Sequence, residues 1–150
     1  TVKTEHKAVL NTCEYLETKG VPVIGYKSDV LPAFYCAESD YKVNFRMDTP
    51  EIVAQFLKTK YDLGLKGGVL ISNPIPHEFS MDKILIDNAI EDAISEMNKL
   101  GIKGKETTPY LLQKIASITK GKSLESNISL VYNNCKLGAQ LSAELTKLSK

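Results

Sequence analysis

The stretch Leu65–Glu78, LKGGVLISNPIPHE, decides the fold, because it joins two glycines, a short apolar run and two prolines. The apolar residues 69–71 are typical of a strand that is covered on both faces. The glycines at 67–68 can adopt backbone angles that suit a tight entry to that strand. Pro74 and Pro76 lack an amide hydrogen, so the chain leaves the sheet there in an extended form. Proteins of the α/β class often bind ligands at such an exit, although a plain connection to the next helix explains the same pattern.

Helices and strands alternate along the rest of the chain. Apolar residues at helical spacing predict helices over Glu5–Lys19, from Pro50 onward, over Met81–Leu100, from Thr107 to Gly121 and from about Ser123 onward. Residues 21–26, VPVIGY, predict a short buried strand, and residues 33–36 predict a second extended piece. This order predicts one α/β domain without an internal boundary.

The sequence also predicts how helices begin and which faces they bury. Residues 49–51 combine a threonine cap, a proline in the first turn and a glutamate at the positive end of the helix dipole. Residues 107–109 repeat the capping pattern. The predicted buried faces contain Ile52, Val53, Phe56 and Leu57; then Ile84, Leu85, Ala89, Ile90, Ala93, Ile94 and Met97; and, in the last helix, Leu124, Ile128, Val131, Leu137, Leu141 and Leu145.

Composition and charge limit the classes of partner. The 150 residues include 19 basic and 18 acidic side chains, which give a net charge of +1, and they contain no long run of lysines. This charge pattern argues against nucleic acid as a binding partner. Cys13, Cys36 and Cys135 are widely spaced in apolar surroundings, which indicates reduced thiols inside a cell and no zinc site. No apolar stretch is long enough for a membrane span, and no leader opens the chain. We therefore expect a cytoplasmic protein without a membrane partner.

Asn127 is the strongest candidate for binding a ligand. It falls near one side of the last predicted helix with Ser123 and Asn134, where these polar residues interrupt the apolar spacing. An amide offers two donors and an acceptor, so it can recognise the edge of a flat heterocycle through paired hydrogen bonds. The alternative is that these side chains bond neighbouring backbone or face water.

Two other segments carry weaker signals. His77 stands beside Glu78 at a loop end, where an exposed histidine and a general base are both compatible with the sequence. Residues 103–106, KGKE, lack the glycine spacing of a phosphate-binding loop and follow a helix, so they predict a solvated turn.

Several motifs together resemble one protein family. CEYLETKGVPVIGY (Cys13–Tyr26), LPAFYCAES (Leu31–Ser39), GGVLISNPIP (Gly67–Pro76), GIKGKETTPYLLQKI (Gly101–Ile115) and GKSLESNISLVYNN (Gly121–Asn134) closely resemble the carboxyl-terminal half of pseudouridine-5′-phosphate glycosidases, also called the indigoidine synthase A family. The resemblance covers nearly all of Thr12–Leu145 in the same order and spacing.

The resemblance implies an enzyme that reversibly splits the carbon–carbon glycosidic bond of pseudouridine 5′-phosphate into uracil and ribose 5-phosphate. It implies a lysine that forms a Schiff base with the ring-opened sugar, an acid-base glutamate and a divalent metal, usually Mn²⁺. An iminium supplies the electron sink that a carbon–carbon bond needs, because no good leaving atom is present. By resemblance, Asn127 contacts the uracil ring. The implied fold is a three-layer α/β/α arrangement with a mixed sheet, in a homotrimer.

This chain also departs from the family pattern. By resemblance, the glutamate and the metal-binding aspartate precede the segment where this chain begins, so the metal ligands lie outside it. The family lysine aligns with Thr4, one residue from Lys3, so that either Lys3 takes the role or the nucleophile is lost. We therefore expect residues 1–150 to be the carboxyl-terminal part of a single glycosidase domain, inactive alone. The alternative is a non-catalytic pseudoenzyme that keeps the fold for ligand binding or assembly.

Overall fold

The computed structural model describes residues 12, 15–16, 18–33 and 35–149. Its elements are the strands β1 (Val23–Tyr26), β2 (Phe45–Met47) and β3 (Leu70–Ser72), the helices α2 (Pro50–Asp62), α3 (Lys83–Lys99), α4 (Thr107–Ile118) and α5 (Lys122–Leu148), and the short 3-10 helices η1 (His77–Phe79) and η2 (Gly104–Glu106). Most of the predicted helix over Glu5–Lys19 lies outside the described residues. Gly20, which follows it, has the positive φ expected of a left-handed cap.

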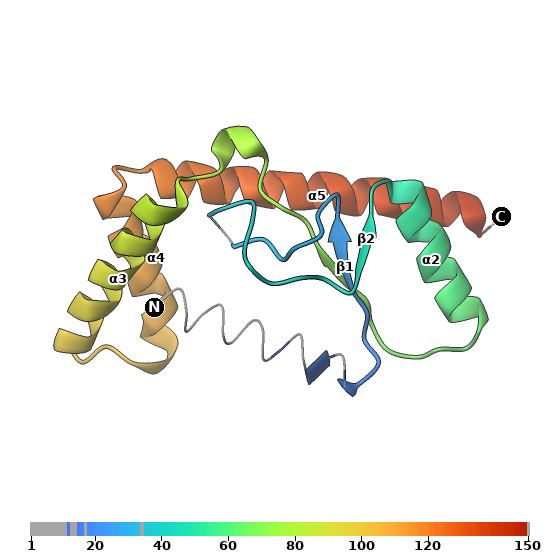
Figure 1. Ribbon diagram of the computed structural model, residues 1–150, viewed down its shortest axis with the longest axis horizontal. Helices are drawn as coiled ribbons and strands as arrows, with labels where there is room; N and C mark the ends of the chain where they lie inside the picture. Colours follow the sequence, from blue (N-terminus) through green and yellow to red (C-terminus); the bar gives the residue numbers. More distant parts are fainter. Residues whose placement is uncertain (1–11, 13–14, 17, 34, 150) are drawn as a thin grey trace.

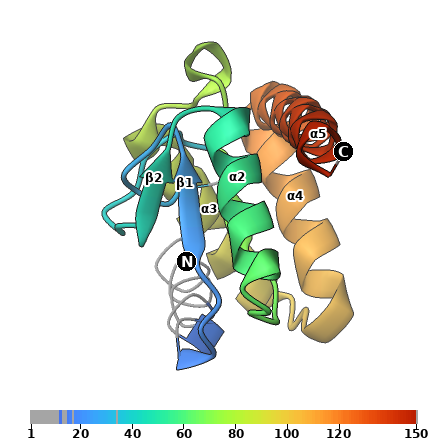
Figure 2. The ribbon, with the colours of Figure 1, turned by 90° about the vertical axis from the view of Figure 1, so that its right-hand side faces the viewer.

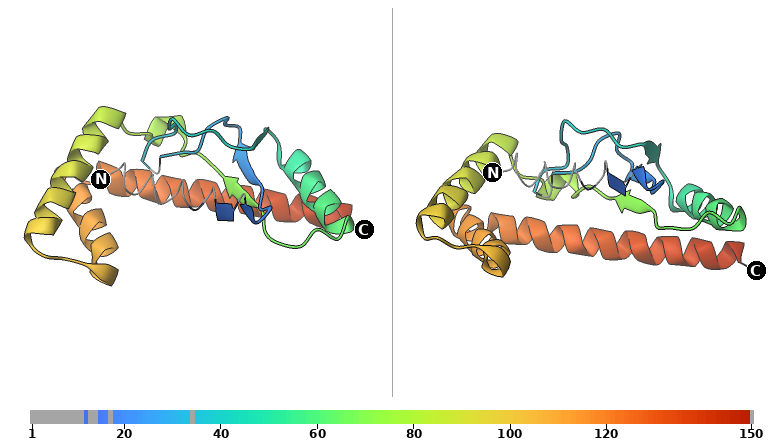
Figure 3. Two further views of the ribbon diagram at one scale, coloured as in Figure 1. Left: turned by 60° about the horizontal axis from the view of Figure 1, so that its bottom comes forward. Right: turned by 90° about the horizontal axis from the view of Figure 1, so that it is seen from below.

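Helix α5 organises the molecule. It runs the length of the structure, with α2 beside its carboxyl-terminal end and α3 and α4 at its amino-terminal end (Figure 1). Viewed nearly along α5, α2 stands between the strands and α5 (Figure 2). Seen from below, the strands and α2 lie along one side of α5 (Figure 3). In the described part of the chain, no helix is long and apolar enough to cross a membrane.

The three strands form a parallel sheet in the order β2-β1-β3. Ile24 in the central strand β1 lies opposite Phe45 in β2 and Ile71 in β3, and it is fully buried. The α/β class predicted from the sequence is therefore confirmed. Among the described strands all pairing is parallel, and antiparallel pairing is confined to two isolated bridges, including the one between Ala33 and Cys36. The extended piece predicted at residues 33–36 is that single bridge and not a full strand.

The prediction for the apolar run at residues 69–71 was partly wrong. A strand forms there, but β3 lies at an edge of the described sheet, and Leu70 is 37% exposed. The buried central strand is instead β1, because it has a neighbour on each side. Gly67 adopts a positive φ of 94° just before β3, as the entry to the strand requires.

Helix α2 begins as its sequence predicts. Thr49 is the cap, and its hydroxyl oxygen accepts a hydrogen bond from the backbone N–H of Ile52 at 3.3 Å. Such a cap stabilises a helix by about 1 kcal/mol. The threonines before Pro109 do not repeat this arrangement, because η2 leads directly into α4 and no side chain caps it. Backbone hydrogen bonds of the preceding turn replace the cap, and these cannot be read from residue types.

A buried lysine ties the end of α2 to the loop that precedes β3. The Lys60 side chain is nearly buried, at 6% exposure, and its ammonium donates to the carbonyl oxygens of Leu65 at 2.9 Å, Lys66 at 3.2 Å and Gly67 at 2.7 Å. The same ammonium lies 4.8 Å from the ring centroid of Tyr61. Lys60 thereby closes the loop whose end sets the position of β3.

Two apolar clusters hold the elements together. The first joins α3 and α4 with residues 35–36 and contains Tyr35, Cys36, Ile86, Ile90, Ala93, Leu111 and Ile115. The second joins α2 and α5 through Val53, Leu137 and Leu141, with the strands packed against it. Burial of apolar surface in such clusters stabilises the folded state by roughly 25 cal/mol per Å².

Several side chains that the spacing assigned to buried faces are exposed. They are Ile52 in α2, Ile84 and Leu85 in α3, and Leu124, Ile128 and Val131 in α5. Helical spacing identifies an apolar side of a helix, but it does not say whether another element covers that side. In the described residues, nothing covers these side chains fully.

Candidate functional site

Polar side chains of α5 bond to the segment that leaves β3. The side-chain amide of Asn73 donates to the side-chain oxygen Oδ1 of Asn134 at 3.0 Å, and the side-chain amide of Asn133 donates to the backbone carbonyl oxygen of Pro74 at 2.9 Å. Further toward the start of α5, the Ser126 hydroxyl donates to the carbonyl oxygen of Phe79 at 2.7 Å. We call these contacts between residues 126–134 and residues 73–79 the polar seam.

The seam forms because the two prolines leave backbone carbonyls at residues 73–79 without partners in the sheet. An extended segment that exits a sheet must satisfy its carbonyls elsewhere, since unpaired polar groups are costly to bury. Ser126 and Asn133 supply donors seven residues apart, about two helical turns, so both lie on the same side of α5 and reach the same segment. The exit of β3 is thus fixed against α5 by side chains and not by main-chain pairing.

Asn127 lies at the border of this seam. It follows Ser126 on α5 and is half-buried, with no hydrogen-bonding partner among the residues that the structure describes. Ser123, one turn earlier, is buried, and its hydroxyl likewise has no partner there. Asn134 is exposed and is paired with Asn73. The three residues lie near one side of α5, which is helical from Lys122 to Leu148, and Asn127 is the amide of the group that has no partner among the described residues.

Sequence reasoning missed two members of the seam. Asn133 and Ser126 hold the backbone of residues 74 and 79, but neither was singled out. The available signal was the pair Asn133-Asn134, in which adjacent amides point to different sides of a helix and can therefore bond to two partners.

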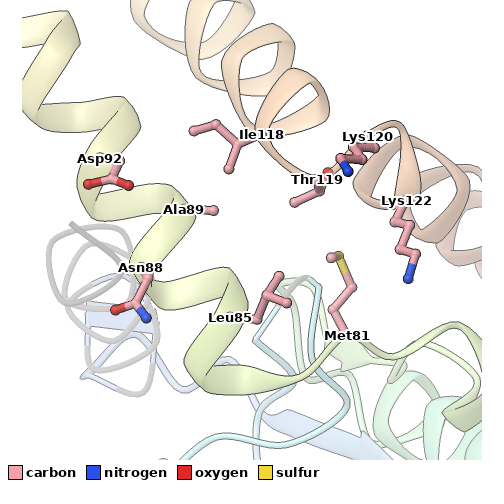
Figure 4. Close-up of a pocket in the computed structure, with 9 residues that line it drawn as sticks. All are labelled: Met81, Leu85, Asn88, Ala89, Asp92, Ile118, Thr119, Lys120 and Lys122. Carbon is pink, nitrogen blue, oxygen red and sulfur yellow. The ribbon is translucent and has the colours of Figure 1, made fainter.

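A separate cleft of about 380 Å³ opens between α3 and the turn from α4 to α5. Met81, Leu85, Ala89 and Ile118 line its apolar part, and Asn88, Asp92, Thr119, Lys120 and Lys122 line its polar part (Figure 4). Asn127 does not line this cleft, so the cleft and the border of the polar seam are different places on the molecule.

The other sequence candidates do not gather at the seam or the cleft. His77 is exposed in η1, and Lys103 and Lys105 are exposed beside or within η2, which confirms the prediction of a solvated turn. Lys3 lies outside the described residues. Cys36 is buried, and its burial, followed by the charge of Asp87, raises the pKa of the thiol.

The described residues do not suit a divalent metal ion. Within them, no three His, Cys, Asp or Glu side chains lie close enough together to hold one. Mn²⁺ needs several hard oxygen ligands around one point. The cleft supplies one carboxylate, from Asp92, and the polar seam supplies none.

Comparison with known proteins gives the same family over nearly the whole chain. The model of the family described as indigoidine synthase A like protein matches residues 7–144. The chain is similar to curated pseudouridine-5′-phosphate glycosidases from Clostridium botulinum, 56% identical over 93% of this chain, and from Petrotoga mobilis, 56% identical over 95%. It spans 45% and 48% of the length of these two relatives, so it covers about half of each.

Solved structures show the same likeness. A crystal structure of the prealnumycin C-glycosynthase in complex with ribulose 5-phosphate matches 92% of this chain with a TM-score of 0.81 and 33% identity, and this chain covers 45% of it. An indigoidine synthase A-like protein from Thermotoga maritima matches 91% with a TM-score of 0.76 and 29% identity. By the family match over residues 7–144, this chain belongs to the indigoidine synthase A family.

Proposed function

We propose that this chain forms part of an enzyme that reversibly cleaves pseudouridine 5′-phosphate to uracil and ribose 5-phosphate. Relatives that carry the name pseudouridine-5′-phosphate glycosidase are 56% identical to it, and a C-glycosynthase shares its fold. Both names describe chemistry at a glycosidic bond, and the bond in pseudouridine joins two carbons. Because the chain spans about half of these relatives, the rest of the catalytic machinery belongs to polypeptide outside it.

The observation that carries the proposal is the unpaired, half-buried amide of Asn127 beside the polar seam. A half-buried amide without a partner loses hydrogen bonds to water and regains none, which costs free energy until a ligand supplies them. The uracil ring offers an N–H donor beside carbonyl acceptors on one edge, and one amide matches that pair. The seam fixes the backbone on the neighbouring segment, so the amide presents a defined position to the ring.

The carbon–carbon bond sets the remaining chemical requirement. When the carbon–carbon bond breaks, its electron pair stays on the uracil carbon, which takes up a proton, and the sugar carbon is left electron-poor. A lysine nitrogen bonded to that sugar carbon donates its lone pair and stabilises it as an iminium. We propose Lys3 for this role, because it is one residue from the position that the family lysine takes. The acid-base glutamate and the Mn²⁺ ligands of the resemblance would come from the other polypeptide, since the described residues offer no donor set for the metal.

The proposal includes the setting of the enzyme. Residues 1–150 are the carboxyl-terminal part of a single domain that is completed by an amino-terminal half, and the completed protein is a cytoplasmic homotrimer. The support is the share of the relatives that this chain spans, 45% to 48%, together with the family resemblance.

Substitution at residue 127 tests the proposal in the direction of synthesis. The protein assayed is this chain co-expressed with the part of the Clostridium botulinum relative that lies outside the 139-residue match. Asn127→Ala should raise the KM for uracil by about 10- to 100-fold, because two hydrogen bonds are lost, and should leave the KM for ribose 5-phosphate within about twofold. Gln140→Ala is the matched control, since it removes an exposed amide from the same helix.

Two results would count against the proposal. An unchanged KM for uracil in Asn127→Ala would remove the residue from the binding site. An assembled protein that binds uracil but forms no product would favour the non-catalytic alternative.

Borohydride reduction with ribose 5-phosphate tests the lysine separately, since a labelled peptide that contains Lys3 supports its role and a label found only elsewhere excludes it.

A further inference from the structure

Helix α5 has an exposed apolar side that its packing does not explain. Leu124, Ile128 and Val131 are 54%, 48% and 54% exposed, and Cys135 continues the same row as an exposed free thiol. These positions are three or four residues apart, so they lie on one side of the helix. We call this row the α5 stripe; its neighbour Tyr132 is 73% exposed.

The α5 stripe differs from the other two sides of the helix. The core side packs through Leu137 and Leu141 against α2. A second side carries charged and polar residues, including Lys122, Glu125 and Lys136, and faces water. The stripe carries no charge from residue 124 to residue 135, although it is exposed. A contiguous exposed apolar row on a soluble helix marks an interaction surface.

The length of the family proteins indicates what covers the stripe. The matched relatives are about twice as long as this chain, and the C-glycosynthase that shares its fold is also covered only to 45%. Their remaining polypeptide is long enough to cover an exposed face of the part that this chain represents. We propose that the α5 stripe binds the polypeptide that supplies the other half of the family fold, whether it is joined to this chain or separate.

A second copy of this chain fits the stripe less well. The four positions extend over eleven residue steps, from 124 to 135, and span about 16 Å of a helix roughly 10 Å wide, which gives a footprint on the order of 200 Å². A stable dimer buries about 800 Å² on each partner. The stripe must therefore be one part of a larger interface. The polypeptide that supplies the other half of the family fold can extend that interface to the edges of the described sheet, where Phe45 and Leu70 are also exposed.

The location of the stripe links this interface to the proposed site. Asn127 lies on α5 between the core side and the stripe, one residue before Ile128. A polypeptide on the stripe would border the Asn127 amide and shield it from water. The effect on Asn127 rests on the proposed function, but binding at the stripe can be tested without measuring enzyme activity.

Alkylation of Cys135 in the unmodified chain measures coverage of the stripe. The chain is studied alone and co-expressed with the part of the Clostridium botulinum relative outside its match. Site-resolved mass spectrometry should show iodoacetamide labelling of Cys135 at least about 10-fold slower in the complex. A complex in which Cys135 reacts as fast as in the free chain would overturn the inference, as would the absence of any complex.

Substitution of the stripe gives an independent measurement. We replace three stripe residues together, with Leu124→Gln, Ile128→Gln and Val131→Gln. The affinity for the polypeptide that supplies the other half should fall by roughly 100-fold, because each half-exposed apolar side chain should contribute about fivefold. Glu125→Gln with Lys136→Gln is the matched control on the charged side, and its capture should be unchanged. Equal capture by both variants would overturn the inference, and so would a homodimer of the chain alone in which Cys135 is protected. An inactive complex with protected Cys135 would refute the proposed function but keep the interface.

Discussion

Replacing Lys60 with methionine should loosen the loop that enters β3. The ammonium of Lys60 makes three hydrogen bonds, to the carbonyl oxygens of Leu65, Lys66 and Gly67, at 2.7 to 3.2 Å. Methionine keeps the apolar stem of the side chain but removes every donor. The three carbonyls would then depend on water, and they lie in an exposed loop that water can reach.

The size of the effect follows from these contacts. A hydrogen bond to a charged group contributes about 1.5 to 3 kcal/mol, but three bonds from one ammonium are not additive, and hydration of the loop recovers part of the loss. We therefore expect Lys60→Met to lower the free energy of unfolding by about 2 kcal/mol. This corresponds to a fall in Tm of about 4 to 8 °C for a chain of this size.

The assay compares two lysines of the same helix. Lys58 forms an exposed ion pair with Asp62 at 2.7 Å, so Lys58→Met should cost no more than about 0.5 kcal/mol. Urea unfolding gives both values, and amide hydrogen exchange should show faster exchange at residues 63–70 in Lys60→Met alone. Equal stability of the two variants would refute the reasoning, because the three hydrogen bonds of the Lys60 ammonium would then contribute no more than one surface ion pair.

Two further predictions concern packing and pH. A Cβ on Gly25 would clash with the backbone oxygen of Ser28, so Gly25→Ala should destabilise the chain by at least about 2 kcal/mol in thermal unfolding. Gly138 lies in a helix with open space around its Cβ position, so Gly138→Ala should stabilise the chain by about 0.5 to 1 kcal/mol. The Lys114 ammonium, hydrogen-bonded to the carboxylate of Glu96, lowers the pKa of that carboxyl. The stability that this pair contributes is therefore present above pH 4.5 and is lost as the pH falls through the lowered pKa. Glu96→Gln should flatten the acidic side of a plot of Tm against pH, and an unchanged acidic slope would contradict this.

Local signals in the sequence predicted some element boundaries, such as the start of α2, and missed others. The cap at Thr49 is a matter of residue type at a fixed offset from Pro50, and it appears as predicted. Strand β2 was missed because its three residues, Phe45–Met47, are half exposed and lack an apolar run. The side chains of Arg46 and Asn44 hold that segment. Arg46 forms ion pairs with the nearby Asp48 and with Asp29, and Asn44 accepts a hydrogen bond from the backbone N–H of Val23; Asp29 and Val23 are distant in sequence.

At the candidate site too, contacts between residues distant in sequence could not be predicted. The side of α5 that carries Asn127 could be predicted, because helical geometry alone places Ser123, Asn127 and Asn134 together. Which amide is already paired could not be predicted, since Asn134 bonds Asn73 across 61 positions of sequence. The unpaired amide is identified only when the partners of its neighbours are known.

The three sides of α5 explain why the polar seam and the α5 stripe depend on each other. Leu137 and Leu141 fix the rotation of the helix against α2, and the Asn133 bond to Pro74 fixes its register along the exit of β3. With rotation and register both set, Asn127 can only lie between the buried side and the stripe. A helix of 27 residues that is anchored on one side therefore presents the amide and the apolar row together. Any polypeptide that covers the α5 stripe therefore also changes how much water reaches the Asn127 amide.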